Sequence, residues 1–142
     1  MQTKLVIAIG VLLVVVVLGA VLIATPTPLN GPETPFISEN VRVSSPLPGA
    51  KVSKMFTASG EARGVWYFEA SFPIFILDES GEKVGQGIAQ AEGDWMTEDF
   101  VPFMAEVVVE NYAGPATISF VKDNPSGLPE HDDSVSFPII IQ

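Results

Sequence analysis

The sequence predicts an all-β protein: an immunoglobulin-like β-sandwich of about seven strands, preceded by one N-terminal transmembrane helix. Three observations lead to this prediction. After residue 37, short segments alternate between apolar and polar residues and are separated by turn residues at roughly 8- to 12-residue spacing, which is typical of a sandwich. No amphipathic helical pattern occurs in that part. Residues 5–24 contain no charge, Pro, Asn or Gln.

The apolar segment, residues 5–24, has the length and composition of a membrane anchor. Fifteen of its twenty residues are Val, Leu or Ile, and a helix of that length spans ~30 Å, the thickness of the hydrocarbon core. Lys4 precedes the segment and no Lys or Arg follows it until Arg42. The positive-inside rule therefore places residues 1–4 in the cytoplasm and the remainder of the chain outside it.

The alternative for residues 5–24 is a cleaved signal peptide, which would make the domain a secreted protein. The apolar part of a signal peptide usually has about 7 to 15 residues and ends in an A-x-A-like pattern. Here the segment is longer, and Leu22 stands where a small residue is needed. An uncleaved anchor is therefore the favoured prediction.

Residues 25–36 contain four prolines and few side chains to bury. Pro-rich segments extend by ~3.1 Å per residue, so we expect a tether without secondary structure. The predicted domain follows as residues 37–142.

The first half of the domain contains three predicted strands. Residues 41–43 and 52–61 are predicted as strands on either side of a turn at 44–49. In the long segment, residues 65–77, strand alternation puts Trp66 and Phe72 on one face and Tyr67 and Glu69 on the other. Pro73 cannot donate to a sheet ladder, so we expect a bulge or an edge position there.

The second half follows the same pattern. Residues 78–83 are predicted as a turn, and residues 84–91 as a strand weakened by two glycines. A polar connection over residues 92–100 leads to a regularly alternating strand over 101–109. Strands around residues 118–120 and 135–141 close the chain, separated by a long loop at 123–133.

The charge and the absence of cysteine exclude several classes of function. All 17 acidic residues and six of the seven basic ones follow residue 24, so the exported part is strongly acidic. Such a field repels nucleic acid and anionic lipid headgroups. With no cysteine, disulfides, thiolate metal sites, cysteine nucleophiles and a lipid-modified cysteine are all excluded. The hydrophobic core alone must stabilise the domain.

Several motifs are more specific than a generic sandwich. They are GVWYFEASFPIFILD at 64–78, GDWMTEDFVPF at 93–103 and DNPSGLPE at 123–130, together with SPLPGAKV at 45–52 and SGEA at 59–62. In this order they resemble the bacterial immunoglobulin-like domain associated with spore germination, which often occurs beside a GerMN domain in envelope lipoproteins. The resemblance covers about residues 41–142. It implies an extracytoplasmic, non-catalytic module that acts in binding or in assembling envelope complexes. The chain has neither a GerMN domain nor a lipid-modified cysteine, so a role in germination is not carried over.

One candidate binding surface is the polar connection with two large side chains. Trp95 and Met96 next to Glu98 and Asp99 would form an aromatic platform surrounded by carboxylates, suited to a sugar face or a cationic peptide. Alternatively, Trp95 covers one end of the sandwich while nearby polar side chains bond the turn backbone.

A second candidate surface is the strand face that carries Tyr67 and Glu69, opposite Trp66. A flat face of that kind could dock a partner, although a carboxylate facing solvent is the commoner case. If Glu69 is instead buried, a charged partner in the region of Arg63 is required.

The loop at 123–133 is the third candidate, with Asn124, Ser126 and Glu130 as partner-binding residues. Its Asp, Asn and Glu side chains are also the oxygen ligands that Ca²⁺ prefers, but their spacing does not match a Ca²⁺-binding loop. Asp and Asn before Pro and Gly are ordinary turn formers. We therefore predict no metal site and no cofactor.

No catalytic residue is predicted. His131 is the single histidine, and it lies in one loop with Ser126 and Asp132. The chain has no G-x-S-x-G elbow and no G-x-x-x-x-G-K-[ST] phosphate loop. The predicted function is a membrane-anchored, non-catalytic binding or scaffolding module of the bacterial cell envelope that docks a protein or a cell-wall glycan. The alternatives are a structural subunit of an envelope complex, a self-assembling surface protein and, least favoured, a hydrolase of envelope polymers.

Overall fold

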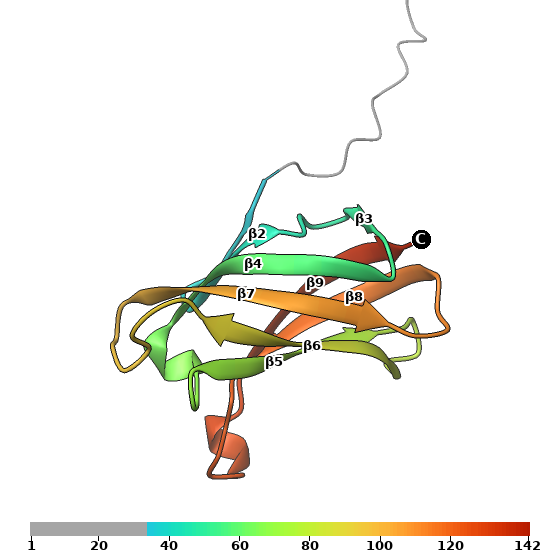
Figure 1. Ribbon diagram of the computed structural model, residues 1–142. Coiled ribbons are helices and arrows are strands. Elements are labelled where there is room, and N and C mark those ends of the chain that lie inside the picture. Colours follow the sequence, from blue (N-terminus) through green and yellow to red (C-terminus); the bar gives the residue numbers. More distant parts are fainter. Residues whose placement is uncertain (1–33) are drawn as a thin grey trace, which may run out of the picture. The chain divides into compact units, whose positions relative to one another are not determined.

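Residues 34–142 are described by a computed structural model, in which nine strands form one sheet that folds back on itself around an apolar core (Figure 1). The strands are β1 (Phe36–Ile37), β2 (Val41–Ser45), β3 (Lys51–Val52), β4 (Met55–Arg63), β5 (Ser71–Leu77), β6 (Lys83–Ala91), β7 (Phe100–Val109), β8 (Gly114–Val121) and β9 (Ser134–Ile141). Two short 3-10 helices, η2 (Gly64–Trp66) and η3 (Pro129–His131), lie in the connections.

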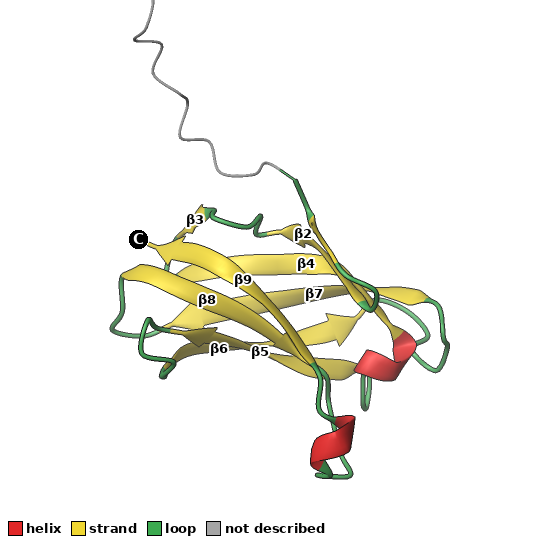
Figure 2. Ribbon diagram, turned by 180° about the vertical axis from the view of Figure 1, so that it is seen from behind, coloured by secondary structure: helices red, strands yellow, loops and turns green. Residues whose placement is uncertain are grey.

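The strand order is β1-β2-β4-β7-β6-β5-β8-β9-β3, and the pairs are antiparallel except β3 with β9. Figure 2 shows the two halves of the sheet, with η2 and η3 in loops beyond the strand ends. The all-β prediction is confirmed. The two strands beyond the expected seven, β1 and β3, have two residues each, which is too short for an alternating pattern to predict.

Alternation along β7 shows why this sequence forms a sandwich. Its buried residues are every second side chain: Val101, Phe103, Ala105, Val107 and Val109. Because successive side chains of a strand point to opposite faces, a period of two buries one face and leaves the other to solvent. The strand predicted over residues 101–109 is confirmed.

A continuous line of aromatic rings crosses the interior. Each ring centroid lies 5.1 to 5.9 Å from the next, in mostly tilted or edge-on arrangements. Such pairs stabilise a core by about 0.5 to 1.5 kcal/mol beyond the burial of their area. The line of rings therefore adds to the stability of a domain that has no disulfide. In order, its members are Tyr67, Phe72, Phe103, Phe120, Phe137 and Phe36.

The prediction of one strand over residues 65–77 is wrong in its first half. Residues 64–66 form η2, and Glu69 and Ala70 adopt positive φ angles of 49° and 63° in a tight turn before β5. Tyr67 is therefore buried beside Trp66 instead of opposite it, while Phe68 is 40% exposed. The alternation of apolar residues over 65–70 therefore arises from side chains that pack around a helical turn and a tight turn, not from a strand.

The other turn and edge predictions in this region are confirmed. Pro73 pairs with Ile88 of β6, but β5 gains its second neighbour, β8, only from Ile74 onward, so Pro73 occupies a local edge. In the following turn, one carboxylate oxygen of Asp78 accepts hydrogen bonds from the backbone N–H groups of Ser80 and Glu82.

Within residues 34–142 no helix is long and apolar enough to cross a membrane. The predicted cytoplasmic residues 1–4, the anchor at 5–24 and most of the tether at 25–36 lie outside the described residues. The tether prediction is wrong at its last residue, because Phe36 already pairs with Val43 in the sheet.

Candidate functional site

Three connections that carry the predicted candidate residues meet at one end of the sandwich. The backbone N–H of Gly64 in η2 donates to the carbonyl oxygen of Asp99 in the β6–β7 connection, at 3.0 Å. The N–H of Asp123, at the start of the loop containing η3, donates to the carbonyl of Trp66, also at 3.0 Å. Figures 1 and 2 show these connections on the same side of the strands.

The β6–β7 connection, residues 92–99, is called the rim loop below. It packs directly on Gly64: a Cβ at that position would collide with the carbonyl oxygens of Trp95 and Thr97. Glycine is therefore required here so that the two backbones can approach each other.

The rim loop is also held by its own side chains. The N–H of Met96 donates to the carboxylate of Asp94 at 3.0 Å. The N–H of Asp99 donates to the hydroxyl of Thr97 at 3.2 Å. These bonds are the Asx- and ST-turn contacts typical of such residues, and they confirm the expectation that polar side chains bond the turn backbone.

Between η2 and the rim loop lies a shallow hollow of about 360 Å³, called the Trp95 hollow below. Trp95 is half-buried and packs against the core, while Met96 and Val65 are 77% and 58% exposed. The hollow is therefore lined by one aromatic side chain that packs against the core, Trp95, and by two apolar side chains that are exposed to solvent, Val65 and Met96. Its lining residues are Gly64, Val65, Tyr67, Trp95, Met96, Thr97 and Glu98.

Tyr67 reaches the hollow from the core side. Only 3% of its surface is exposed, and its hydroxyl donates a 2.6 Å hydrogen bond to the carbonyl of Val101. Burial raises the pKa of this phenol well above its usual value, because the charged phenolate would lose its hydration in the interior. The prediction that Tyr67 faces solvent on a docking face is therefore wrong.

Glu69 is exposed at the tip of the turn before β5 and does not line the hollow. An exposed carboxylate needs no buried partner, so the requirement for a charge near Arg63 does not arise. Asp99 contributes its backbone carbonyl to the contact with Gly64, and Glu98 lines the hollow with its side chain.

The loop over residues 122–133 uses most of its polar groups internally. The side-chain amide of Asn124 donates to the Leu128 carbonyl at 2.8 Å and to the Asp132 carboxylate at 2.7 Å. The hydroxyl of Ser126 bonds Asn124, and Glu130 is exposed on η3. Among residues 34–142, no three His, Asp or Glu side chains gather in a way that could hold a metal ion.

The same loop does not form a nucleophile–base–acid arrangement. Asp132 accepts from Asn124, and Ser126 donates to Asn124. A catalytic triad requires the serine to bond the histidine and the histidine to bond the acid. His131 is an exposed residue of η3 whose carbonyl accepts from Lys122.

A cluster of arginines next to the hollow was missed by the sequence reasoning. The guanidinium groups of Arg42 and Arg63 lie 3.8 and 4.1 Å from the centroid of the Phe100 ring. Arg42 also pairs with Glu61 at 2.8 Å, and Arg63 donates to the backbone carbonyl of Glu98 at 3.3 Å. No spacing rule brings these residues together, because they come from three strands.

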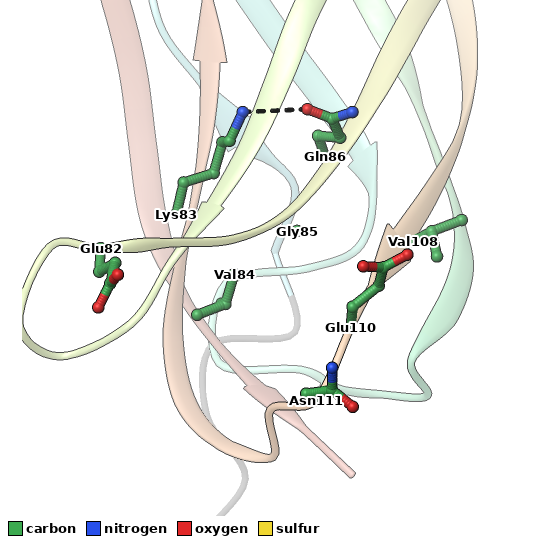
Figure 3. A pocket seen from close by; sticks show the side chains of 8 residues that line it. All are labelled: Glu82, Lys83, Val84, Gly85, Gln86, Val108, Glu110 and Asn111. Carbon is green, nitrogen blue, oxygen red and sulfur yellow. Dashed lines mark hydrogen bonds between the residues drawn. The ribbon is translucent and has the colours of Figure 1, made fainter.

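A larger and more polar groove of about 590 Å³ lies at the start of β6 and the end of β7 (Figure 3). The ammonium group of Lys83 donates to the side chain of Gln86 at 3.1 Å within it. None of the residues predicted as candidates line this groove. The lining residues are Glu82, Lys83, Val84, Gly85, Gln86, Val108, Glu110 and Asn111.

Comparison with known proteins identifies the family to which the chain belongs. The family model described as the immunoglobulin-like domain of bacterial spore germination matches residues 40–127. The chain is also similar to a protein of Serratia proteamaculans (strain 568) named probable GTP-binding protein EngB. The two are 29% identical over 80 residues, which cover 49% of this chain and 37% of that protein. No solved structure matches the chain.

Proposed function

Because the chain belongs to the family of immunoglobulin-like domains of bacterial spore germination, we propose that it is a membrane-anchored, non-catalytic binding module of the bacterial cell envelope. In this proposal residues 5–24 span the membrane, residues 1–4 stay in the cytoplasm and residues 37–142 act outside it. The partner is a protein or a cell-wall glycan.

The observation that carries the proposal is the Trp95 hollow. It exposes Met96 and Val65 at a place where the backbone is fixed by the contact of Gly64 with the rim loop. Because the backbone beneath these side chains is already fixed, a partner that covers them orders little additional backbone. GTP binding is not part of the proposal, because the chain has no G-x-x-x-x-G-K-[ST] loop to hold the phosphates.

Site-specific cross-linking in intact cells tests the binding role. A photo-activated side chain in place of Met96 is expected to capture a defined partner. The same side chain in place of Met55, an exposed residue at the start of β4, serves as the matched control. Capture of the same species from both positions, or from neither, would contradict the proposal.

Protease added to whole cells tests the topology separately. Residues 37–142 should be digested from outside, whereas a cytoplasmic domain would be protected until the membrane is broken. A protein of full mass in the membrane fraction supports the anchor. A soluble protein whose mature N-terminus lies near Thr25 would instead indicate a cleaved signal peptide.

A second candidate function is a structural subunit that associates with copies of itself or with a larger complex. Ile88 and Met104, which lie on the neighbouring strands β6 and β7, are 52% and 50% exposed and favour this alternative. Sedimentation of the full chain in detergent tests it: an Ile88→Ser, Met104→Ser variant would dissociate an assembly formed through this face.

A further inference from the structure

The chemistry around the Trp95 hollow defines the partner more closely than the proposed function does. We propose that the hollow receives a large apolar side chain from a partner protein segment that also carries lysine or arginine. This inference rests on the proposed binding role, and it selects a basic, apolar peptide segment over a glycan or an acidic segment.

The first argument is the apolar lining. Val65, Met96 and the half-buried Trp95 form the walls, and two of these side chains are largely exposed. Covering them removes apolar surface from water, which favours an aliphatic or aromatic group as the occupant.

The second argument concerns the few polar groups of the hollow, which a glycan would need. The hydroxyl of Thr97 accepts from the Asp99 N–H and donates to the Asp99 carboxylate at 3.4 Å, so its donor and one of its two lone pairs are used within the loop. The Tyr67 hydroxyl is bonded to Val101, so Glu98 and the indole N–H of Trp95 are the remaining polar side-chain groups of the lining. Recognition of a sugar requires several directed polar contacts, and one carboxylate and one indole N–H supply few of them.

The third argument is the charge of the rim loop. It carries four exposed carboxylates and no basic residue, and the whole chain has no Lys or Arg between Lys83 and Lys122. Within the described part of the chain, none of the four forms an ion pair. A negative field of this kind attracts cationic segments and repels acidic ones. The four are Glu92, Asp94, Glu98 and Asp99.

Arg63, which contacts the rim loop, forms no ion pair with the carboxylates of the loop. Arg63 stacks on Phe100 and donates to the backbone carbonyl of Glu98, so its contact with the rim loop is to a neutral group. Arg42 pairs with Glu61 of β4. The side chains of the rim carboxylates therefore stay available to lysine or arginine side chains of a partner.

The test uses the four methionines of the chain as internal reporters. The full chain, labelled with ¹³C in the methionine methyl groups and kept in an uncharged detergent, is titrated with a blocked hexapeptide. The peptide has a central Leu-Phe pair with two lysines on each side. The Met96 methyl signal should shift in a saturable way, whereas those of Met55 and Met104 on the sheet should stay in place.

Two further ligands and three variants make the result specific. A peptide with glutamates in place of the lysines and a neutral cell-wall disaccharide should both leave the Met96 signal unchanged. Glu98→Gln should weaken binding of the lysine peptide about two- to fivefold, as expected for one partly screened charge pair. Glu106→Gln removes an exposed carboxylate of β7 away from the hollow and should leave affinity unchanged. Val65→Ser, at a position 58% exposed, should weaken binding without unfolding the domain.

The outcomes separate this inference from the proposed function. A shift of Met96 with the disaccharide or the glutamate peptide, or equal shifts of all the methionine signals with the lysine peptide, would overturn it. If the lysine peptide leaves Met96 unshifted while cross-linking from Met96 still captures a partner in cells, the binding role holds and the partner chemistry proposed here is wrong. If neither occurs, both fail.

Discussion

The hydroxyl of Tyr67 and the carbonyl of Val101 share a 2.6 Å hydrogen bond inside the sandwich, under the floor of the Trp95 hollow. It joins the segment after η2 to the start of β7, and the Tyr67 ring begins the line of aromatic contacts. Tyr67 thus links the candidate site to the core, although it offers little surface to a partner.

Loss of the Tyr67 hydroxyl should therefore destabilise the domain. In Tyr67→Phe the Val101 carbonyl stays buried without its donor, which costs about 1 to 3 kcal/mol of unfolding free energy. Denaturant unfolding of the full chain in detergent at pH 7 measures this. Tyr112→Phe is the matched control, because Tyr112 bonds Pro115 at a more exposed position and its loss should cost less.

Alkaline pH should act through the same residue. Burial holds the pKa of Tyr67 above its ordinary value of 10, so the folded state binds this proton more tightly than the unfolded state does. The stabilisation is complete below about pH 10 and is lost as pH rises above it. Tyr67→Phe should show a smaller loss of stability between pH 9 and pH 11 than the unchanged chain. An equal loss in both would show that other groups cause it.

Gly64→Ala should disrupt the candidate site. The added Cβ has no space beside the carbonyl oxygens of Trp95 and Thr97, so the rim loop must move. Overpacking of this kind costs about 1 to 3 kcal/mol. The Met96 methyl signal should shift and binding of the lysine peptide should weaken.

Gly81→Ala is the control for this substitution. Gly81 has φ +83° but open space around its Cβ position. The variant should cost about 1 kcal/mol through backbone strain and leave the Met96 signal unchanged. A Gly64→Ala protein with an unshifted Met96 signal and full affinity would mean that the close contact does not position the loop.

The turn after β5 should weaken in acid. Hydrogen bonds, first from the Ser80 hydroxyl and then from backbone N–H groups, lower the pKa of Asp78 below its usual 3.8. The turn is therefore fully stabilised above about pH 4, and this stabilisation is lost as pH falls through the lowered pKa. Amide exchange at Ser80 and Glu82 should be faster in Asp78→Ala, whereas Glu79→Ala should leave it unchanged.

Phe103→Ala should be the most damaging of these changes. The ring is buried in the middle of the aromatic line, between Phe72 and Phe120. Removing it costs about 3 to 5 kcal/mol in transfer and cavity terms. Ile88→Ala, on the exposed side of β6, should change the unfolding free energy by less than about 0.5 kcal/mol. Similar losses in both variants would contradict the assignment of the core.

The parts of the fold that follow from local pattern were predictable. Val101 to Val109 alternate and form β7, and Asp78 precedes the expected turn. The segment around Glu69 was not predictable, because alternating apolar residues do not indicate the positive φ angles that turn the chain there. This one turn moved Tyr67 from the predicted surface into the core.

The candidate site was predictable only in part, for the same reason. Trp95, Met96 and Glu98 could be identified because a polar connection rarely contains two large apolar side chains. The role of Gly64 and the stacking of two arginines on Phe100 depend on which strands become neighbours. That information comes from long-range pairing and not from any short stretch of sequence.

The line of six rings has a practical consequence for handling the protein. Since the described fold is held by ring contacts and backbone ladders, and the sequence contains no cysteine, dithiothreitol should leave the melting temperature unchanged. The domain can therefore fold in a reducing or an oxidising compartment without the help of an oxidoreductase.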